Sequence, residues 1–419
     1  MENEMELENV TPISDESSET KEIKSESRFT FLEATAVIVG HGVGTGILSV
    51  PYLASRNNVF DFIWIVAIAF FINVLLHLMI AELSYHNDGK QFVKCLENIF
   101  TNPKVKKVVS WVTFILLGFS VLMNVCSYIT GSSVAIASIY YTIRGMEIPE
   151  VFPLGVRIVS MLIYYVLVAI VVYFGMKIVG ITEKYCLFGM ITVMVILFIA
   201  VLVNGTYELP NQFYSYKNIF ALYGMISFAL SSVMSVPQVV KGLNGNVKKI
   251  RGSIVLGTGI NITLVIVLTI ITLIGTGAIT QNGALNDLSA SVGGWVSLVG
   301  FIFTLIALST SLWANTLNLR DVIAEQSKLG LKLSWLIASL PCLIIAIAAT
   351  FFQSTFVMFA RIASAVQIVT SLGIIIAFGV CRHRVKCSPI LGVFGAVPFQ
   401  VLVVLASIIA SYGSLIKIV

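Results

Sequence analysis

A glycine-rich segment, VGHGVGTGILSVP at residues 39–51, interrupts an apolar stretch that is otherwise long enough for a membrane helix. It holds four glycines in seven residues, and a proline ends it. Glycine destabilises a helix interior by about 1 kcal/mol relative to alanine, so the composition predicts a break. At such a break, backbone N–H groups are free to bind an anion and carbonyls are free to bind a cation. The segment therefore predicts a ligand site built from main-chain atoms.

One titratable side chain, His41, lies inside this segment. Histidine titrates near neutral pH, so His41 is a candidate for carrying a proton. The role that we favour is that of a neutral hydrogen-bond donor bracing the broken helix. Glu33, His77 and Glu82 also fall in apolar segments, closer to the expected helix ends. For Glu33 and Glu82 we expect ion pairs with basic residues of neighbouring loops.

Composition places the chain in a membrane. Of 419 residues, 57% are hydrophobic and 11% are charged, and the mean hydropathy is +0.95. Soluble domains carry roughly 25% charged residues, so the chain is expected to be an all-α integral membrane protein. The N-terminus is acidic rather than basic, so no cleavable signal peptide is expected. The six cysteines form no C-x-x-C pair, and we expect no transition-metal site and no cofactor.

Eleven apolar segments are long enough to span a bilayer, which takes about 20 residues. They lie near 32–55, 60–84, 107–140, 156–174, 180–203, 217–241, 252–279, 294–320, 333–352, 355–381 and 388–416. With the N-terminus in the cytosol, twenty of the 26 Lys and Arg residues fall on the cytoplasmic side. Because basic residues concentrate in cytoplasmic loops, we expect a cytoplasmic N-terminus and an extracytoplasmic C-terminus in the cell membrane.

Three regions are expected along the chain. Residues 1–28 hold nine acidic and three basic residues and no aromatic side chain, so they cannot bury a core and predict a disordered cytosolic tail. Residues 29–381 form a core of ten helices. Residues 382–419 form a loop and an additional eleventh helix.

The first and sixth spans share a sequence pattern. Ser49-Val50-Pro51 in GILSVPYL aligns with Ser235-Val236-Pro237 in SVMSVPQV. The two spans are five apart and run in opposite directions in the expected topology. Matching interruptions in oppositely directed helices are typical of a five-plus-five inverted repeat, and the second break is expected near Ser227–Ser232. The alternative, for Gly42 and Gly46 above all, is that small residues simply let helices pack closely.

The runs GHGVGTGILSVPYL, ISFALSSVMSVPQVV and KGLNGNVKKI resemble the amino acid/auxin permease family, part of the amino acid–polyamine–organocation superfamily. The resemblance extends over most of residues 30–380, and the compact loops suggest a prokaryotic member. It implies a LeuT-type fold with helices 1 and 6 broken. It also implies alternating access and cation-coupled symport of amino acids.

The resemblance also implies site residues. The substrate carboxylate is expected at the amides of Gly44, Thr45 and Gly46, and the ammonium at the carbonyls of Ser227, Phe228 and Ala229. Ser231 and Ser232 lie nearby, and Asn124 and Tyr128 of the third span, one turn apart, are candidates for completing the pocket. No charged side chain is needed, and small residues around Ser231 favour a neutral or aromatic substrate.

A sodium site shared within the superfamily would use Gly40 and Val43 of the first span with Ala307, Thr310 and Ser311 of the eighth. These oxygen ligands suit sodium. Threonine and serine hydroxyls in membrane helices also bond back to carbonyls of their own helix, so sodium and proton coupling both stay open. Some relatives carry a lysine midway along the fifth span; here that region holds apolar residues and Thr192, with Lys184 nearer the cytoplasmic end.

Other functions are less well supported. A divalent-metal transporter of this fold would need carboxylate, amide or thioether ligands at the breaks, and Met234 alone does not make such a site. An amino acid sensor without transport, or a carrier of another small solute, are the alternatives that stay open. No HExxH, GxSxG or deep carboxylate pair predicts an enzyme. The expected partners are the amino acid and the bilayer, and the short basic loops give no support to nucleic-acid binding.

Overall fold

The computed structural model describes residues 28–44, 46–149, 151–207, 215–276, 279, 284–352, 356–385 and 389–416. Thr45 and the expected tail up to residue 27 lie outside the described residues. The described part is helical and contains no strand, which confirms the all-α class. Its α-helices are α2 (Phe31–Val43), α3 (Gly46–Ser55), α4 (Val59–Tyr85), α5 (Phe92–Glu97), α6 (Pro103–Ile143), α7 (Leu154–Tyr173), α8 (Met176–Asn204), α9 (Tyr216–Ala229), α10 (Val236–Gly242), α11 (Val247–Gly275), α12 (Ala284–Val292), α13 (Trp295–Ser327), α14 (Leu331–Thr350), α15 (Phe356–Val385) and α16 (Val397–Leu415).

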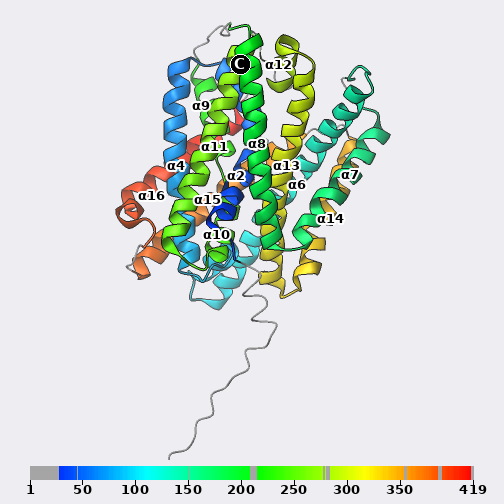
Figure 1. Cartoon of the computed structure of the whole chain (residues 1–419). Helices are drawn as coiled ribbons and strands as arrows, with labels where there is room; N and C mark the ends of the chain where they lie inside the picture. Colours follow the sequence, from blue (N-terminus) through cyan, green and yellow to red (C-terminus); the bar gives the residue numbers. More distant parts are fainter. Residues whose placement is uncertain are drawn as a thin grey trace, which may run out of the picture.

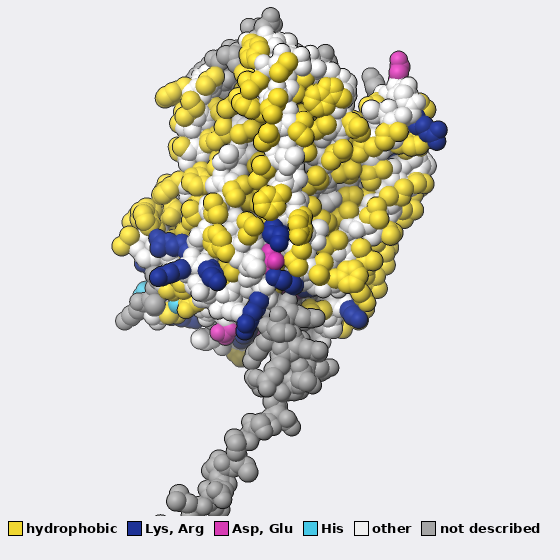
Figure 2. Space-filling model, in the orientation of Figure 1, with side chains coloured by type: hydrophobic (Ala, Val, Ile, Leu, Met, Phe, Trp, Pro, Cys, Tyr) yellow, Lys and Arg dark blue, Asp and Glu magenta, His cyan; other side chains and the backbone are white. Residues whose placement is uncertain are grey.

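Most of these helices are long and apolar enough to cross a membrane. Among the described residues, nine spans meet this criterion, and one of the nine consists of α9 together with α10. The bent pair α2–α3, counted as one span, makes ten. The remaining expected span, 355–381, coincides with α15, a helix of 30 residues. Hydrophobic side chains cover the middle of the visible face, and Lys and Arg gather mainly at one end (Figure 2). The chain is therefore a multi-pass membrane protein.

The first helix is interrupted where the glycine-rich segment predicts it. Thr30 begins α2 through a capping box, in which its side chain accepts from the Glu33 N–H and its own N–H donates to the Glu33 carboxylate. The helix ends at Val43, Gly44 leaves the helical conformation, and α3 resumes at Gly46 with a bend of 54° between the two.

The sixth span is interrupted as well. α9 ends at Ala229, residues 230–232 are not helical, and a short 3₁₀ turn, η1 (Val233–Ser235), leads into α10. Pro237 stands in the first turn of α10, where its missing N–H costs no hydrogen bond. The expected break near Ser227–Ser232 is thus confirmed, and each Ser-Val-Pro triplet follows its break.

The broken helix α2 lies at the centre of the bundle. Every residue from Glu33 to Val43 is buried, and α2 packs against α8, α11 and α13. A helix that is buried on all sides belongs in a protein interior. α7 and α14 lie at one edge of the bundle and α16 at the opposite edge (Figure 1). α16 packs on α9, and a Cβ at Gly413 would collide with the main chain of Phe220.

Candidate functional site

A small pocket lies between the two helix breaks. It is lined by His41, Gly42, Gly44, Gly46, Asn124, Tyr128, Phe228 and Ser231. Its free volume is about 10 Å³, roughly the space that one water molecule needs. No Asp, Glu, Lys or Arg is among its lining residues. The described conformation is therefore a contracted one, and any amino acid would have to widen the pocket in order to bind.

The structure brings most of the sequence-predicted substrate residues to this pocket. Gly44, Gly46, Asn124, Tyr128, Phe228 and Ser231 line it. The side chain of Asn124 is buried, and its Oδ1 atom has no hydrogen-bond partner among the described residues. Ser227 lines a second cavity instead, between α4, α9, α15 and α16. Ala229 lies behind the pocket against Gly46, and Thr45 lies outside the described residues.

Two of the main-chain groups expected to bind substrate already have protein partners. The Gly44 N–H donates to the Ser311 Oγ at 3.0 Å, and the Ala229 carbonyl accepts from the Asn261 Nδ2 at 3.0 Å. A substrate group at either position would replace these bonds. These two main-chain groups are therefore paired within the protein in the contracted form, as buried backbone groups require.

Three of the four glycines of the first span lie within helices and approach neighbouring helices closely. Only Gly44 stands at the break, whereas Gly40 and Gly42 are helical and Gly46 begins α3. A Cβ at Gly40 would lie 2.9 Å from the Thr310 Cβ, and one at Gly46 would lie 2.7 Å from the Ala229 Cα. These glycines let neighbouring helices approach closely, so the packing interpretation holds for them.

The expected cation ligands converge where α2 meets α13. The Ser311 Oγ lies 2.9 Å from the Gly40 carbonyl and 3.2 Å from the His41 carbonyl, and donates its one proton between them. The Thr310 hydroxyl donates to the Ala307 carbonyl of its own helix at 2.9 Å. Val43, Ala307, Thr310 and Ser311 are fully buried. The oxygen set fits a hard cation, but both hydroxyl protons already point at the carbonyls that would bind it.

Side chains from other helices hold the second break in place. The His41 Nδ1 lies 2.7 Å from the Ser235 Oγ. The His77 Nε2 accepts from the Ser232 N–H at 2.9 Å, and the Ser232 Oγ donates to the Ile38 carbonyl at 2.6 Å. The Ser232 N–H, which the break leaves outside the helix ladder, is thereby paired with a side chain.

Several of these residues escape sequence reasoning. The sequence places His77 closer to a helix end, yet its side chain is fully buried against the second break. Asn261 of α11 and the pair Asn315 and Asn318 of α13 are amides in apolar helices, which is the only signal that they give. The Asn315 Nδ2 lies 3.4 Å from the His41 Nε2 and 3.5 Å from the Tyr128 OH. Polar residues inside membrane helices are functional candidates by default.

The carboxylates near helix ends differ from each other. Glu33 pairs with Lys177 at 2.6 Å, as expected for an ion pair with a neighbouring basic residue. Glu82 accepts hydrogen bonds from the N–H groups of Ile390 and Leu391, at 3.2 and 2.9 Å. Glu82 therefore anchors the segment that precedes α16.

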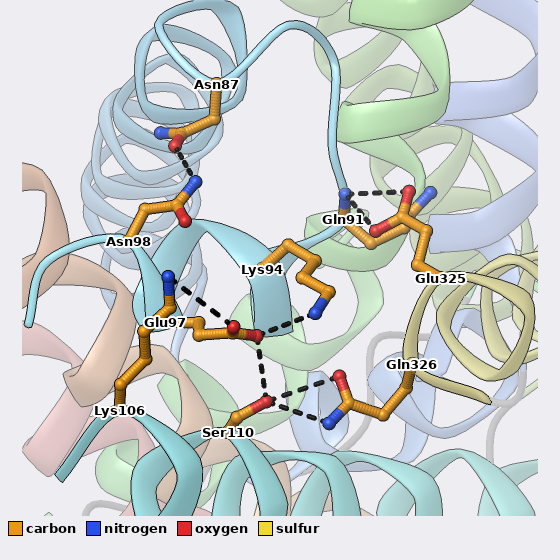
Figure 3. A network of polar contacts seen from close by, with 9 residues as sticks. All are labelled: Asn87, Gln91, Lys94, Glu97, Asn98, Lys106, Ser110, Glu325 and Gln326. Carbon is orange, nitrogen blue, oxygen red and sulfur yellow. Dashed lines mark hydrogen bonds and ion pairs between the residues drawn. The ribbon is translucent and has the colours of Figure 1, made fainter. Parts of the chain in front are cut away.

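A polar network joins α5 and the start of α6 to the C-terminal end of α13 (Figure 3). Glu97 of α5 bonds Lys94 at 2.8 Å and Ser110 at 3.1 Å, and lies 3.7 Å from Lys106. Burial alone would raise the pKa of Glu97, but the hydrogen bonds from Lys94 and Ser110 and the charges of both lysines lower it. The network therefore contains an ionised carboxylate at neutral pH.

The same network connects to the second break through Gln91. The Gln91 N–H donates to the Glu325 carboxylate at 3.1 Å (Figure 3). Asn318 of α13 donates both to the Gln91 Oε1 and to the Met234 carbonyl, each at 2.9 Å. The loop before α5 is thus coupled to the backbone of η1.

Comparisons with known proteins agree with this architecture. Mhp1, a nucleobase-cation-symport-1 family transporter solved in a closed conformation with bromovinylhydantoin bound, has a TM-score of 0.62 at 14% identity, covering 93% of this chain and 92% of Mhp1. MhsT in complex with L-phenylalanine has a TM-score of 0.66 at 13% identity, covering 93% and 99%. None of the curated proteins compared with the chain matches its sequence.

The chain thus has the LeuT fold, with its pocket between two broken helices. It belongs to the tryptophan/tyrosine permease family, whose model matches residues 27–412, and is therefore a transporter of small solutes rather than an enzyme.

Proposed function

We propose that the chain imports aromatic amino acids, tryptophan or tyrosine, by cation-coupled symport and alternating access. The observation that carries this proposal is the pocket between the breaks, because no Asp, Glu, Lys or Arg is among its lining residues. Such a pocket suits a zwitterion whose two charged ends are met by main-chain dipoles and whose side chain is neutral. The family match supports the aromatic class, and MhsT binds L-phenylalanine within the same fold.

In this proposal the substrate carboxylate binds at the N-terminus of α3, at the N–H groups of Gly44, Thr45 and Gly46. The ammonium binds at the carbonyls of the last turn of α9, where the helix dipole is negative. The substrate ring extends toward Asn124, Tyr128 and Phe228. Because the free volume is about 10 Å³, binding requires α2–α3 and α9–α10 to separate, which is the movement that alternating access provides.

The cation that drives uptake would act beside Gly40 and Ser311, as a proton or as sodium. We place the N-terminus in the cytoplasm and the C-terminus outside the cell membrane, as the distribution of basic residues favours. The nearer relationship to amino acid/auxin permeases and a prokaryotic source are part of the same proposal, and they rest on the compact loops and the two Ser-Val-Pro segments.

The test is uptake by the purified protein in proteoliposomes. Labelled L-tryptophan, L-tyrosine, L-phenylalanine, L-leucine, L-glutamate and L-lysine are compared under a sodium gradient alone and a proton gradient alone. We expect accumulation of the aromatic amino acids and exclusion of glutamate and lysine, because an unpaired charge in the pocket is costly. Saturable binding without accumulation would indicate a sensor. Uptake of a hydantoin but of no amino acid would indicate a carrier of another solute.

A further inference from the structure

A carboxyl group in the interior of the bundle, Glu183 of α8, lies beside the expected cation site. Its exposed fraction is 1%. A Cβ built on Gly40 would lie 3.0 Å from the Glu183 Oε2 and 2.9 Å from the Thr310 Cβ. The carboxyl group, the last turn of α2 and the Thr310–Ser311 turn of α13 therefore meet at one point. The sequence interpretation of the fifth span overlooked this residue.

Both carboxyl oxygens of Glu183 lack a hydrogen-bond partner in the part of the chain that the structure describes. Basic groups on α8 and α13 are engaged elsewhere, since Lys177 pairs with Glu33, Lys184 lies over the Tyr185 ring and Arg320 pairs with Asp321 at 2.7 Å. The charged residues near the start of α11 are exposed. The helices packed against α8 are α2, α7, α11, α12 and α13. The described titratable groups on these helices and on α8 include His41, Tyr164, Tyr165, Cys186, Asp287 and Glu325. Glu183 forms no hydrogen bond or ion pair with any of them.

An ionised carboxylate in this position would be strongly destabilising. Burying a charge without a partner costs so much that the group is neutralised or binds a cation. The site adds a second penalty, because Gly40 belongs to the last turn of α2, where the helix dipole is negative. A bound proton removes both penalties at once. The Thr310 and Ser311 hydroxyls, whose protons already point at carbonyls, favour a proton over a metal cation.

We propose that Glu183 is the residue that binds the coupling proton. The inference rests on the proposed transport function and specifies where its coupling ion binds. A proton from the outer solution forms an O–H bond with the carboxylate, which lets α2 pack against α8 while the substrate is bound between the two broken helices. The same O–H bond breaks toward the inner solution as the substrate leaves, and the carboxylate then repels the C-terminal turn of α2. One proton crosses for each cycle, and no electron is transferred.

The test compares wild type, Glu183→Gln and Glu183→Asp in proteoliposomes, with L-tryptophan and L-tyrosine as probes and a trapped pH indicator. Lys184→Gln is the control, because Lys184 is the adjacent residue and lies over the exposed Tyr185 ring. Glutamine mimics the protonated carboxyl. We therefore expect Glu183→Gln to keep substrate exchange. Its accumulation of substrate driven by a pH gradient should fall at least about tenfold, which is the effect of losing one charge-assisted interaction. It should also lose substrate-dependent proton influx and the rise of uptake at acidic external pH. Glu183→Asp should keep part of each.

Accumulation and proton influx by Glu183→Gln at the wild-type level would overturn the proposal while leaving the transport function intact. Accumulation by the wild type under a sodium gradient alone, without proton influx, would also overturn it. If the wild type transports neither probe, the proposed function fails. The melting temperature of the detergent-solubilised protein then tests whether Glu183 binds a proton. The wild-type melting temperature should fall as pH rises more steeply than that of Glu183→Gln. Equal pH dependence in the two proteins would contradict a buried, proton-binding carboxyl.

Discussion

Gly42→Ala should reduce the initial rate of amino acid uptake about 30-fold or more, although it adds one methyl group. A Cβ at Gly42 would collide with the Asn261 amide and lie 3.1 Å from both the Ala229 carbonyl oxygen and the Ser232 Oγ. Asn261 is the residue that pairs the Ala229 carbonyl at the end of α9. The methyl group therefore pushes the first broken helix away from the second at the place where the two breaks meet.

Gly259→Ala is the matched control for this substitution. Gly259 lies on α11, the helix that carries Asn261, and a Cβ there meets no atom within 4 Å. We expect uptake by Gly259→Ala to stay close to that of the wild type, with both variants compared at equal amounts of monodisperse protein. Equal uptake by the two variants would show that the contact at Gly42 does not matter for transport.

His77→Ala should lower the free energy of unfolding by about 2–4 kcal/mol, because it leaves a cavity and an unpaired buried donor. The His77 Nε2 accepts from the Ser232 N–H at 2.9 Å, and its Nδ1 lies 3.3 Å from the Thr258 Oγ1. The ring must be neutral to accept from an amide, so its Nδ1–H is the donor to Thr258. Reversible unfolding in mixed detergent micelles measures the loss.

His77→Gln is the matched variant, because the glutamine side-chain oxygen can accept a hydrogen bond at a similar distance from the backbone. It should recover at least about half of the stability that His77→Ala loses, since the Ser232 N–H would again be paired. If both variants unfold like the wild type, the second break does not depend on His77. If both lose the same stability, the ring volume rather than the hydrogen bond accounts for the effect.

The two helix breaks are predictable because they are encoded locally. Glycine and proline act on the helix that contains them, so GHGVGTG and the two Ser-Val-Pro triplets mark the interruptions without any tertiary information. The exact limits were harder to place, because the helical state of Gly40 and Gly42 is set by packing against Thr310 and Asn261. Propensity alone cannot outweigh burial at such contacts.

The residues that pair the freed backbone groups are not encoded locally. His77, Asn261 and Asn318 lie far along the chain from the breaks that they hold, and only the fold brings them there. Glu183 is difficult to identify from the sequence for a further reason. It is followed directly by Lys184, and this charged pair has the composition expected of a helix end, whereas the structure buries Glu183 and leaves Lys184 partly exposed.

The central claim is that an amino acid binds between the two interrupted helices and is held at both ends by main-chain groups. The most direct measurement is a cryo-electron microscopy structure with L-tryptophan bound. We expect the carboxylate within hydrogen-bond distance of the Gly44–Gly46 amides, the ammonium at the carbonyls that end α9, and a pocket widened beyond its present volume. Density for tryptophan in the cavity at Ser227 between α4, α9 and α16, with the pocket at Gly44 still contracted, would contradict the claim.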